Sequence, residues 1–129
     1  MSIKKKVLVV DDEPEIVILV KSRLEANGFE AIGADNGKEA IEKALTENPD
    51  IILLDLLMPV MDGYEAMNHL KKHEETKDIP IILFTAAPPE KVIKKGDDTM
   101  NAIDFVMKPF DDGALSTLLK RVKQITNCD

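Results

Sequence analysis

The amino-acid sequence predicts an α/β fold. It should be one domain over residues 1–129, with five parallel strands in a doubly wound sheet and five helices on its two faces. Short apolar runs rich in Val, Ile and Leu recur along the chain, as expected of strands buried on both faces of a parallel sheet. Segments with helical periodicity separate these runs, so right-handed crossovers would connect the strands and helices would cover the sheet. The length suffices for one hydrophobic core.

The first strand and the first helix have the clearest boundaries. Residues 7–10 form an uninterrupted apolar run, which we interpret as a strand. A helix follows from residue 13 or 14 to residue 26, because Pro14 suits a first helical turn and Asn27-Gly28 suits a helix end.

A strand, a helix and another strand come next. Residues 29–34 make a weaker strand, because a charged residue and a glycine interrupt its apolar pattern. Residues 37–46 have the periodicity of a helix. Its apolar face consists of Ala40, Ile41, Ala44 and Leu45. Asn48-Pro49 breaks the chain before the strand at residues 51–54.

The third helix begins after Asp62, which can cap it, and ends near Lys71-Lys72, whose charges suit a helix C-terminus. Strands are expected at residues 81–84 and 104–107. Residues 86–102, between these strands, have little apolar periodicity, so we expect a short, distorted or mobile fourth helix there.

The final helix is the most regular. Asp111 or Asp112 can cap it. Its apolar stripe consists of Leu115, Leu118, Leu119, Val122 and Ile125.

Composition excludes several functional classes. The formal net charge of −7 gives no electrostatic reason to bind nucleic acid. The single cysteine, Cys128, cannot form an internal disulfide, which fits a reducing compartment. No signal peptide and no apolar stretch of membrane-spanning length is visible. We therefore expect a cytoplasmic protein that is not bound to a membrane.

Polar side chains follow the predicted strands. Asp11 and Asp12 end the first apolar run, Asp55 the third and Thr85 the fourth, while Lys108 follows the fifth. Because the carboxyl ends of parallel strands meet at one edge of a sheet, and ligands bind there, these residues should form one site.

The three acids indicate a metal-assisted phosphoryl transfer. Carboxylates brought close together repel one another unless a cation intervenes, and Mg²⁺ prefers oxygen ligands. Asp11 and Asp12 would hold the metal, and Asp55, on the central strand, would be the nucleophile that forms an aspartyl phosphate. Lys108 would pair with one phosphoryl oxygen, and the Thr85 hydroxyl would donate a hydrogen bond to another.

Four motifs together resemble the receiver domain of two-component response regulators, in order and over essentially the whole chain. They are Asp11-Asp12-Glu13-Pro14, Asp55-Leu56-Leu57-Met58-Pro59-Val60-Met61-Asp62-Gly63, Thr85-Ala86 and Lys108-Pro109-Phe110. The chain resembles stand-alone, chemotaxis-type regulators among them, and the resemblance implies a flavodoxin-like fold.

The resemblance also implies the ligands and the phosphodonor. A histidine kinase or a phosphotransfer protein would donate the phosphoryl group from a phosphohistidine to Asp55. Asp12 and Asp55 would bind Mg²⁺ together with the backbone carbonyl of Leu57, while Asp11 would often act through water. The chain would catalyse only its own phosphorylation and dephosphorylation and would not be an enzyme in the usual sense.

A switch residue and a signalling face follow from the same resemblance. Phe105 would move together with Thr85 on activation, and a downstream protein would bind the face formed by the fourth helix, fifth strand and fifth helix. The interval between Thr85 and Lys108 is one residue longer than is usual, and Asn101 stands where a glycine is frequent. Both departures bear on partner choice.

Alternatives remain open. Because the chain ends just after the last predicted helix, it could be a stand-alone regulator, a phosphorelay intermediate or a receiver excised from a longer regulator. A Mg²⁺-dependent phosphohydrolase is a rival from another class, but such enzymes carry a second acid where this chain has Leu57. A degenerate receiver that serves only as an interaction module is the second rival, and it would not need the intact set of acids and lysine.

Overall fold

The computed structural model describes residues 4–55, 58, 61, 63–85, 104–107 and 112–127. Five strands form one parallel sheet in the order β2-β1-β3-β4-β5. The strands are β1 (Lys6–Val10), β2 (Glu30–Ala34), β3 (Ile51–Leu54), β4 (Ile81–Thr85) and β5 (Asp104–Met107). The predicted doubly wound sheet is confirmed, and each strand lies within one residue of its expected boundaries.

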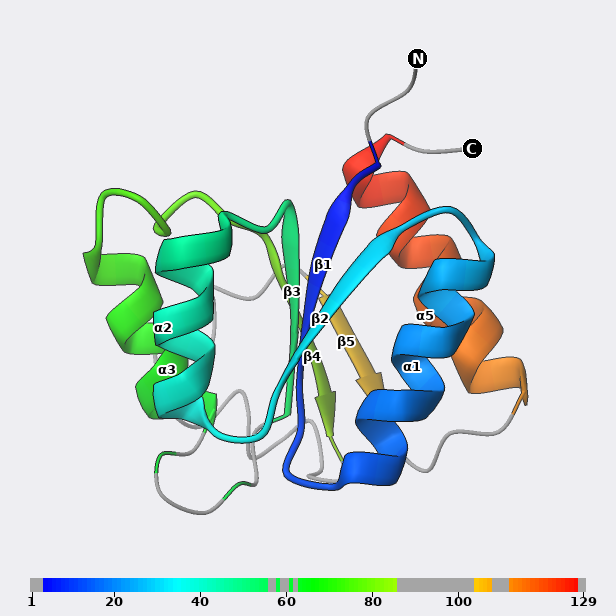
Figure 1. The fold of residues 1–129 in the computed structure, drawn as a ribbon, viewed down its shortest axis with the longest axis horizontal. Helices are drawn as coiled ribbons and strands as arrows, with labels where there is room; N and C mark the ends of the chain where they lie inside the picture. The colour runs from blue at the N-terminus through cyan, green and yellow to red at the C-terminus, as the bar shows by residue number, and fades with distance from the viewer. Residues whose placement is uncertain are drawn as a thin grey trace.

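Helices cover both faces of the sheet (Figure 1). The described helices are α1 (Pro14–Ala26), α2 (Gly37–Glu47), α3 (Gly63–Lys72) and α5 (Asp112–Thr126). In Figure 1 the sheet is seen nearly edge-on, with α1 and α5 on one side and α2 and α3 on the other. The fourth helix expected within residues 86–102 lies outside the described residues, as does the proposed cap Asp62.

Alternate residues of the strands point into two separate cores. The core beneath α1 and α5 takes its strand residues from Val7, Val9, Ala31, Ile51, Leu53, Ile82 and Phe84. The core beneath α2 and α3 takes its strand residues from Leu8, Val10, Ala34, Ile52, Leu54, Ile81 and Leu83. Burial on both faces explains why β1, β3 and β4 read as continuous apolar runs, since a half-exposed strand would alternate.

The weak pattern of β2 has a physical cause. This strand lies at the edge of the sheet, and Glu30 is exposed there. At Gly33 a Cβ would lie 2.7 Å from Cγ1 of Val17, so only a glycine allows α1 to pack this closely on β2. The two residues that interrupt the apolar run therefore reflect the edge position and the helix contact.

The helix ends follow the local signals. Pro14 is the first residue of α1, and Gly28, just beyond its end, adopts φ +89°. Asn36 caps α2, its side chain accepting a hydrogen bond from the Glu39 N–H at 2.9 Å, and Asn48 ends that helix with φ 50°. None of the helices in the described ranges has the length and hydropathy needed to cross a membrane.

Candidate functional site

Two of the predicted acids are placed by the sheet itself. The Asp11 N–H donates a hydrogen bond to the Ala34 carbonyl at 3.0 Å, and the Asp55 N–H donates to the Val10 carbonyl, also at 3.0 Å. These bonds continue the β1–β2 and β1–β3 ladders one residue beyond the strands. Between β1 and β3 the chain order reverses, which is where open parallel sheets bind ligands.

Asp11, Asp12 and Asp55 form one group, the acid cluster. One carboxylate oxygen from each lies within 4.8 Å of the others. Asp11 is fully buried and Asp55 is 3% exposed, whereas Asp12 is exposed to solvent. The sequence prediction that distant acids meet at this edge is confirmed.

Asp11 also shapes the turn into α1. Its Oδ1 accepts a hydrogen bond from the N–H of Glu13, the residue that precedes the helix, at 3.0 Å. A side-chain oxygen that binds a backbone N–H two residues later stabilises a turn and fixes its own carboxylate. One oxygen of Asp11 is thereby oriented, so the same residue stabilises the turn before α1 and contributes to the acid cluster.

The donor set fits a hard divalent cation. Three carboxylates, two of them buried, carry like charges that repel strongly out of bulk water. A cation among them relieves that repulsion, and oxygen donors of this type suit Mg²⁺ better than soft, thiolate-binding metals. The acid cluster can therefore hold a metal ion, with Asp12 on the solvent side.

For the remaining predicted site residues, the structure either describes the backbone alone or does not describe the residue. Thr85 ends β4 at the same edge as the acids, where it is paired with Met107 of β5. The side chain of Thr85 and that of Phe105 lie outside the described residues, as do Leu57 and Lys108 entirely. Met107, the residue directly before Lys108, pairs with Thr85 and therefore lies at this edge of the sheet.

The connection from β3 to α3 is described at two points. The side chains of Met58 and Met61 pack against the core beneath α2 and α3. The Met61 carbonyl accepts a hydrogen bond from the Gly37 N–H at 3.2 Å. This contact between the start of α2 and the connection after β3 was not predicted from the sequence, because nothing local in either segment signals it.

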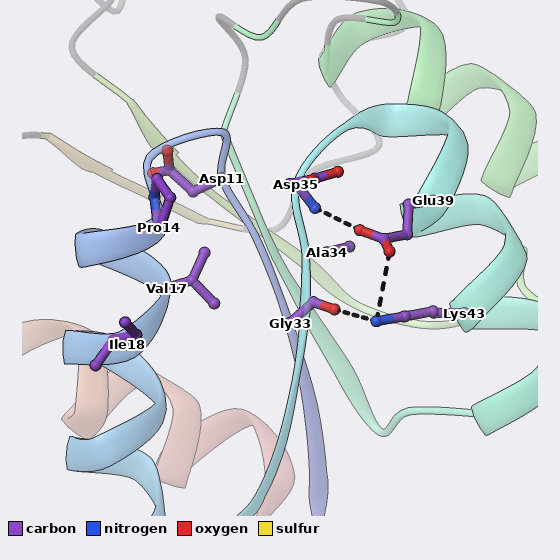
Figure 2. Close-up of a pocket in the computed structure, with 9 residues that line it drawn as sticks. All are labelled: Asp11, Pro14, Val17, Ile18, Gly33, Ala34, Asp35, Glu39 and Lys43. Atoms are coloured by element: carbon purple, nitrogen blue, oxygen red, sulfur yellow. Dashed lines mark hydrogen bonds and ion pairs between the residues drawn. The ribbon is translucent and has the colours of Figure 1, made fainter.

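A pocket of about 280 Å³ lies next to Asp11 between α1, β2 and α2 (Figure 2). Its apolar wall is formed by Pro14, Val17 and Ile18 of α1. On the opposite wall Lys43 Nζ donates to the Gly33 carbonyl at 2.6 Å.

Glu39 completes the polar wall of this pocket. Its Oε2 lies 3.7 Å from Lys43 Nζ, and its Oε1 accepts from the Asp35 N–H at 2.7 Å. These bonds satisfy outward-facing groups of the edge strand and of the turn that follows it. Such side chains protect a sheet edge from pairing with another strand.

Comparison with known proteins agrees with this geometry. The chain is 38% identical over 118 residues to the alkaline phosphatase synthesis transcriptional regulatory protein PhoP of Bacillus subtilis, covering 92% of this chain and 48% of that protein. The chain thus spans about half the length of the first curated relatives that it matches.

Two solved structures are similar throughout. The chemotaxis response regulator CheY4 of Vibrio cholerae superposes with a TM-score of 0.82 at 35% identity, over 93% of this chain and 99% of that one. The response regulator TrrA of Thermotoga maritima, solved in complex with Mg(2+)-BeF, gives a TM-score of 0.80 at 36% identity, over 94% and 98%. The family model of the response regulator receiver domain matches residues 7–120, and the chain therefore belongs to the receiver domains of two-component response regulators.

Proposed function

We propose that Asp55 is the phosphoacceptor of this receiver and that Asp11 and Asp12 complete its metal site. The observation that carries the proposal is the acid cluster, whose three carboxylates lie within 4.8 Å at the carboxyl edge of the sheet. Asp55 directly follows β3, the central strand, and is 3% exposed, so its carboxylate is almost fully buried.

The metal is Mg²⁺ in this proposal, with the Leu57 backbone carbonyl as a further ligand. The solved relative that was crystallised with Mg(2+)-BeF supports this choice. When bound, Mg²⁺ would neutralise the acids and the phosphoryl oxygens. Asp11, whose orientation is fixed by the Glu13 N–H, would contribute through a bound water.

The chain's own residues would carry out the transfer. An oxygen of the Asp55 carboxylate attacks the phosphorus of the donor's phosphohistidine, the phosphorus–nitrogen bond breaks, and its electron pair returns to the imidazole nitrogen. An acyl phosphate on Asp55 results. Lys108 would pair with one phosphoryl oxygen, and the Thr85 hydroxyl would donate a hydrogen bond to another.

The proposed output is a switch. With Thr85 drawn toward the phosphoryl group, Phe105 would fill the space that it leaves, and the face of the fourth helix, β5 and α5 would shift between two existing states. A downstream protein would bind that face. Stand-alone action, a phosphorelay step and membership of a longer regulator all remain compatible with this mechanism.

The partner that donates the phosphoryl group would be a sensor histidine kinase or a phosphotransfer protein, and the cytoplasm is the expected compartment. Ile18 and Leu19 of α1 are 64% and 37% exposed. Exposed apolar side chains on the helix that follows Asp12 give a protein donor a surface to contact. Neither DNA nor membrane binding is part of the proposal, and the whole chain, residues 1–129, would act as one domain.

A phosphohydrolase remains the weaker candidate. Such an enzyme needs a general acid near its nucleophile, and the position two residues after Asp55 is Leu57. The chain would therefore turn over only its own aspartyl phosphate.

Incubation with acetyl phosphate and Mg²⁺, followed by intact-mass measurement, tests the acceptor. The wild type should gain one phosphoryl group, and Asp55→Ala should gain none. Asp50→Asn is the matched control, because Asp50 precedes the same strand at its other end and bonds the Lys6 N–H. Label that persists in Asp55→Ala would refute the assignment.

A further inference from the structure

Gly33 of the edge strand β2 lies against the first turns of α1. It is paired with Val9 of β1, two positions before Asp11. A Cβ at Gly33 would lie 2.7 Å from Cγ1 of Val17, whereas Cδ of Lys21 would be at an ordinary contact distance of 3.7 Å. Figure 2 shows Val17 pointing from α1 toward the strand that carries Gly33, in the pocket that Asp11 also lines. Any side chain at position 33 would therefore have to displace Val17.

Strand formation does not explain this glycine. Gly33 is absent from the residues with positive φ, so its backbone conformation is one that alanine adopts readily. Glycine in the interior of a strand weakens it and often marks a place where another segment approaches closely. Here that segment is α1, and rotating the Val17 side chain away is unfavourable, because a β-branched residue in a helix has one strongly preferred rotamer. A displacement of Val17 would thus be passed to the backbone of α1.

Val17 is bonded to the segment that leads out of the acid cluster. Its N–H donates to the Glu13 carbonyl at 3.2 Å, and the Glu13 N–H donates to Oδ1 of Asp11 at 3.0 Å. Asp12 lies between Asp11 and Glu13 in the chain. A shift of the first turn of α1 therefore acts on two of the three acids.

The backbone and the carboxylate of Asp11 are held from different sides. Its N–H donates to the carbonyl of Ala34, the residue after Gly33, at 3.0 Å, so the sheet fixes its backbone. Its Oδ1 is instead bonded to Glu13 at the start of α1. The distance at which α1 packs on Gly33 therefore sets how the carboxylate of Asp11 is turned relative to its backbone.

We infer that Gly33 is a positioning residue for the metal site. By letting Val17 approach β2, it sets where the first turn of α1 lies. That position in turn sets the orientation of the Asp11 carboxylate and the place of Asp12 in the acid cluster. Gly33 touches neither the cation nor the phosphoryl group, and the inference rests on the function proposed above.

Gly33→Ala tests this directly. Residues that support metal ligands typically change affinity by about 10- to 100-fold, and we expect the Mg²⁺ dissociation constant, measured by calorimetry, to rise by about 10-fold. Calorimetry well below the melting temperature measures folded protein, so a loss of stability alone would leave this constant unchanged. Phosphorylation by acetyl phosphate should be slower than in the wild type at subsaturating Mg²⁺ and should approach the wild-type rate at saturating Mg²⁺.

A second substitution tests the contact itself. The double variant Gly33→Ala with Val17→Ala lacks Cγ1, the atom 2.7 Å from the added Cβ. Its Mg²⁺ affinity should therefore return to that of Val17→Ala alone, as a double-mutant cycle would show. Gly113→Ala is the matched control, since it adds the same methyl group to an exposed glycine in the first turn of α5 and should bind Mg²⁺ like the wild type.

Glu13→Pro keeps the inference testable if Gly33→Ala does not fold. Proline lacks the N–H that orients Asp11, and the φ of Glu13, −94°, is close to the range that proline adopts. Glu13→Ala is its control, because it removes the same charge but keeps the N–H. The Mg²⁺ dissociation constant of Glu13→Pro should be several-fold higher than that of Glu13→Ala.

The outcomes separate the two proposals. If the wild type binds no Mg²⁺, or Asp55→Ala is still labelled, the proposed function fails. If the wild type behaves as proposed while Gly33→Ala binds Mg²⁺ with unchanged affinity, or the double variant binds it as weakly as Gly33→Ala, only the role of Gly33 is overturned. Equal affinities of Glu13→Pro and Glu13→Ala would overturn that role as well, because Gly33 acts through this bond.

Discussion

The two ends of the sheet each gather three acids, but they do so in opposite ways. At the amino end, Glu30, Glu47 and Asp50 surround Lys6. Lys6 donates its backbone N–H to Asp50 at 2.8 Å and its Nζ to the Glu47 carbonyl at 3.0 Å, and it lies 3.9 Å from the Glu30 carboxylate. At the carboxyl end the acid cluster brings carboxylates together within 4.8 Å of one another.

Burial differs as much as pairing. The Glu30 and Glu47 side chains are 54% and 45% exposed, so solvent screens their contacts with Lys6 and each contributes little to stability. Asp11 and Asp55 are buried, where repulsion between like charges is stronger. The amino end connects β1, β2 and α2, whereas the carboxyl end holds an arrangement that a bound cation would stabilise.

The largest expected difference between the two ends is their response to Mg²⁺. A ligand at 100 times its dissociation constant stabilises the folded state by about 2.7 kcal/mol. Mg²⁺ at that level should therefore raise the melting temperature of the wild type by several degrees, and Asp12→Asn should abolish most of the rise. Asp50→Asn should keep it, and an equal loss in both variants would contradict the contrast between the ends.

Removing the cation of the amino end should have a smaller effect. Lys6→Met loses the bond to the Glu47 carbonyl and two exposed ion pairs. The free energy of unfolding, measured by urea denaturation, should therefore decrease by about 1 kcal/mol or less. Phosphorylation by acetyl phosphate should proceed at the wild-type rate. A slower reaction would mean that the two ends are coupled through β1.

Neutralising one acid of the carboxyl end should stabilise the protein when no metal is bound. Asp12 is exposed, so Asp12→Asn should raise the free energy of unfolding in EDTA by less than about 1 kcal/mol. Urea unfolding of Asp12→Asn and Glu42→Gln, an exposed acid of α2, would compare the two charges. Equal stability of the two variants would show that the cluster is not strained by its charge.

The smallest expected effect concerns pH and Lys71, whose Nζ donates to the Lys77 and Ile79 carbonyls at 3.0 Å. Burial lowers the pKa of Lys71 below 10.5, and the charge of Asp78 opposes this. The folded chain then loses this proton at lower pH than the unfolded chain. Wild-type stability should therefore increase relative to Lys71→Met as the pH rises toward 10.5.

Because Lys71 is partly exposed and solvent screens its charge, the change with pH should be on the order of a few tenths of a kcal/mol. Thermal unfolding of both proteins from about pH 7.5 upward would measure it. Wild-type stability that decreases relative to Lys71→Met as the pH rises would have the wrong sign and would reject this assignment.

The sequence predicted the acid cluster because the relevant signals are local. Each apolar run ends directly at its acid, and the parallel sheet brings those ends together. Asp11, Asp12 and Asp55 could therefore be predicted without knowing which loops contact one another. The weak apolar pattern of β2 depended on contacts such as Val17 with Gly33, which no short segment encodes.

The same distinction explains what was missed. The hydrogen bond between Gly37 and Met61 joins two segments that are distant in sequence. From the sequence alone, a glycine after Asn36 indicates only the start of a helix. The roles of Thr85, Phe105 and Lys108 stay predictions, since their side chains lie outside the described residues.

The backbone bonds of Asp11 and Asp55 imply that this site depends on spacing more than on side-chain identity. Apolar residues within β1 could be exchanged for others of similar volume without moving either acid. Deleting a single residue there would instead turn Asp11 toward the opposite face of the sheet, because successive side chains alternate. Insertions and deletions in this short stretch should therefore be far less tolerated than substitutions.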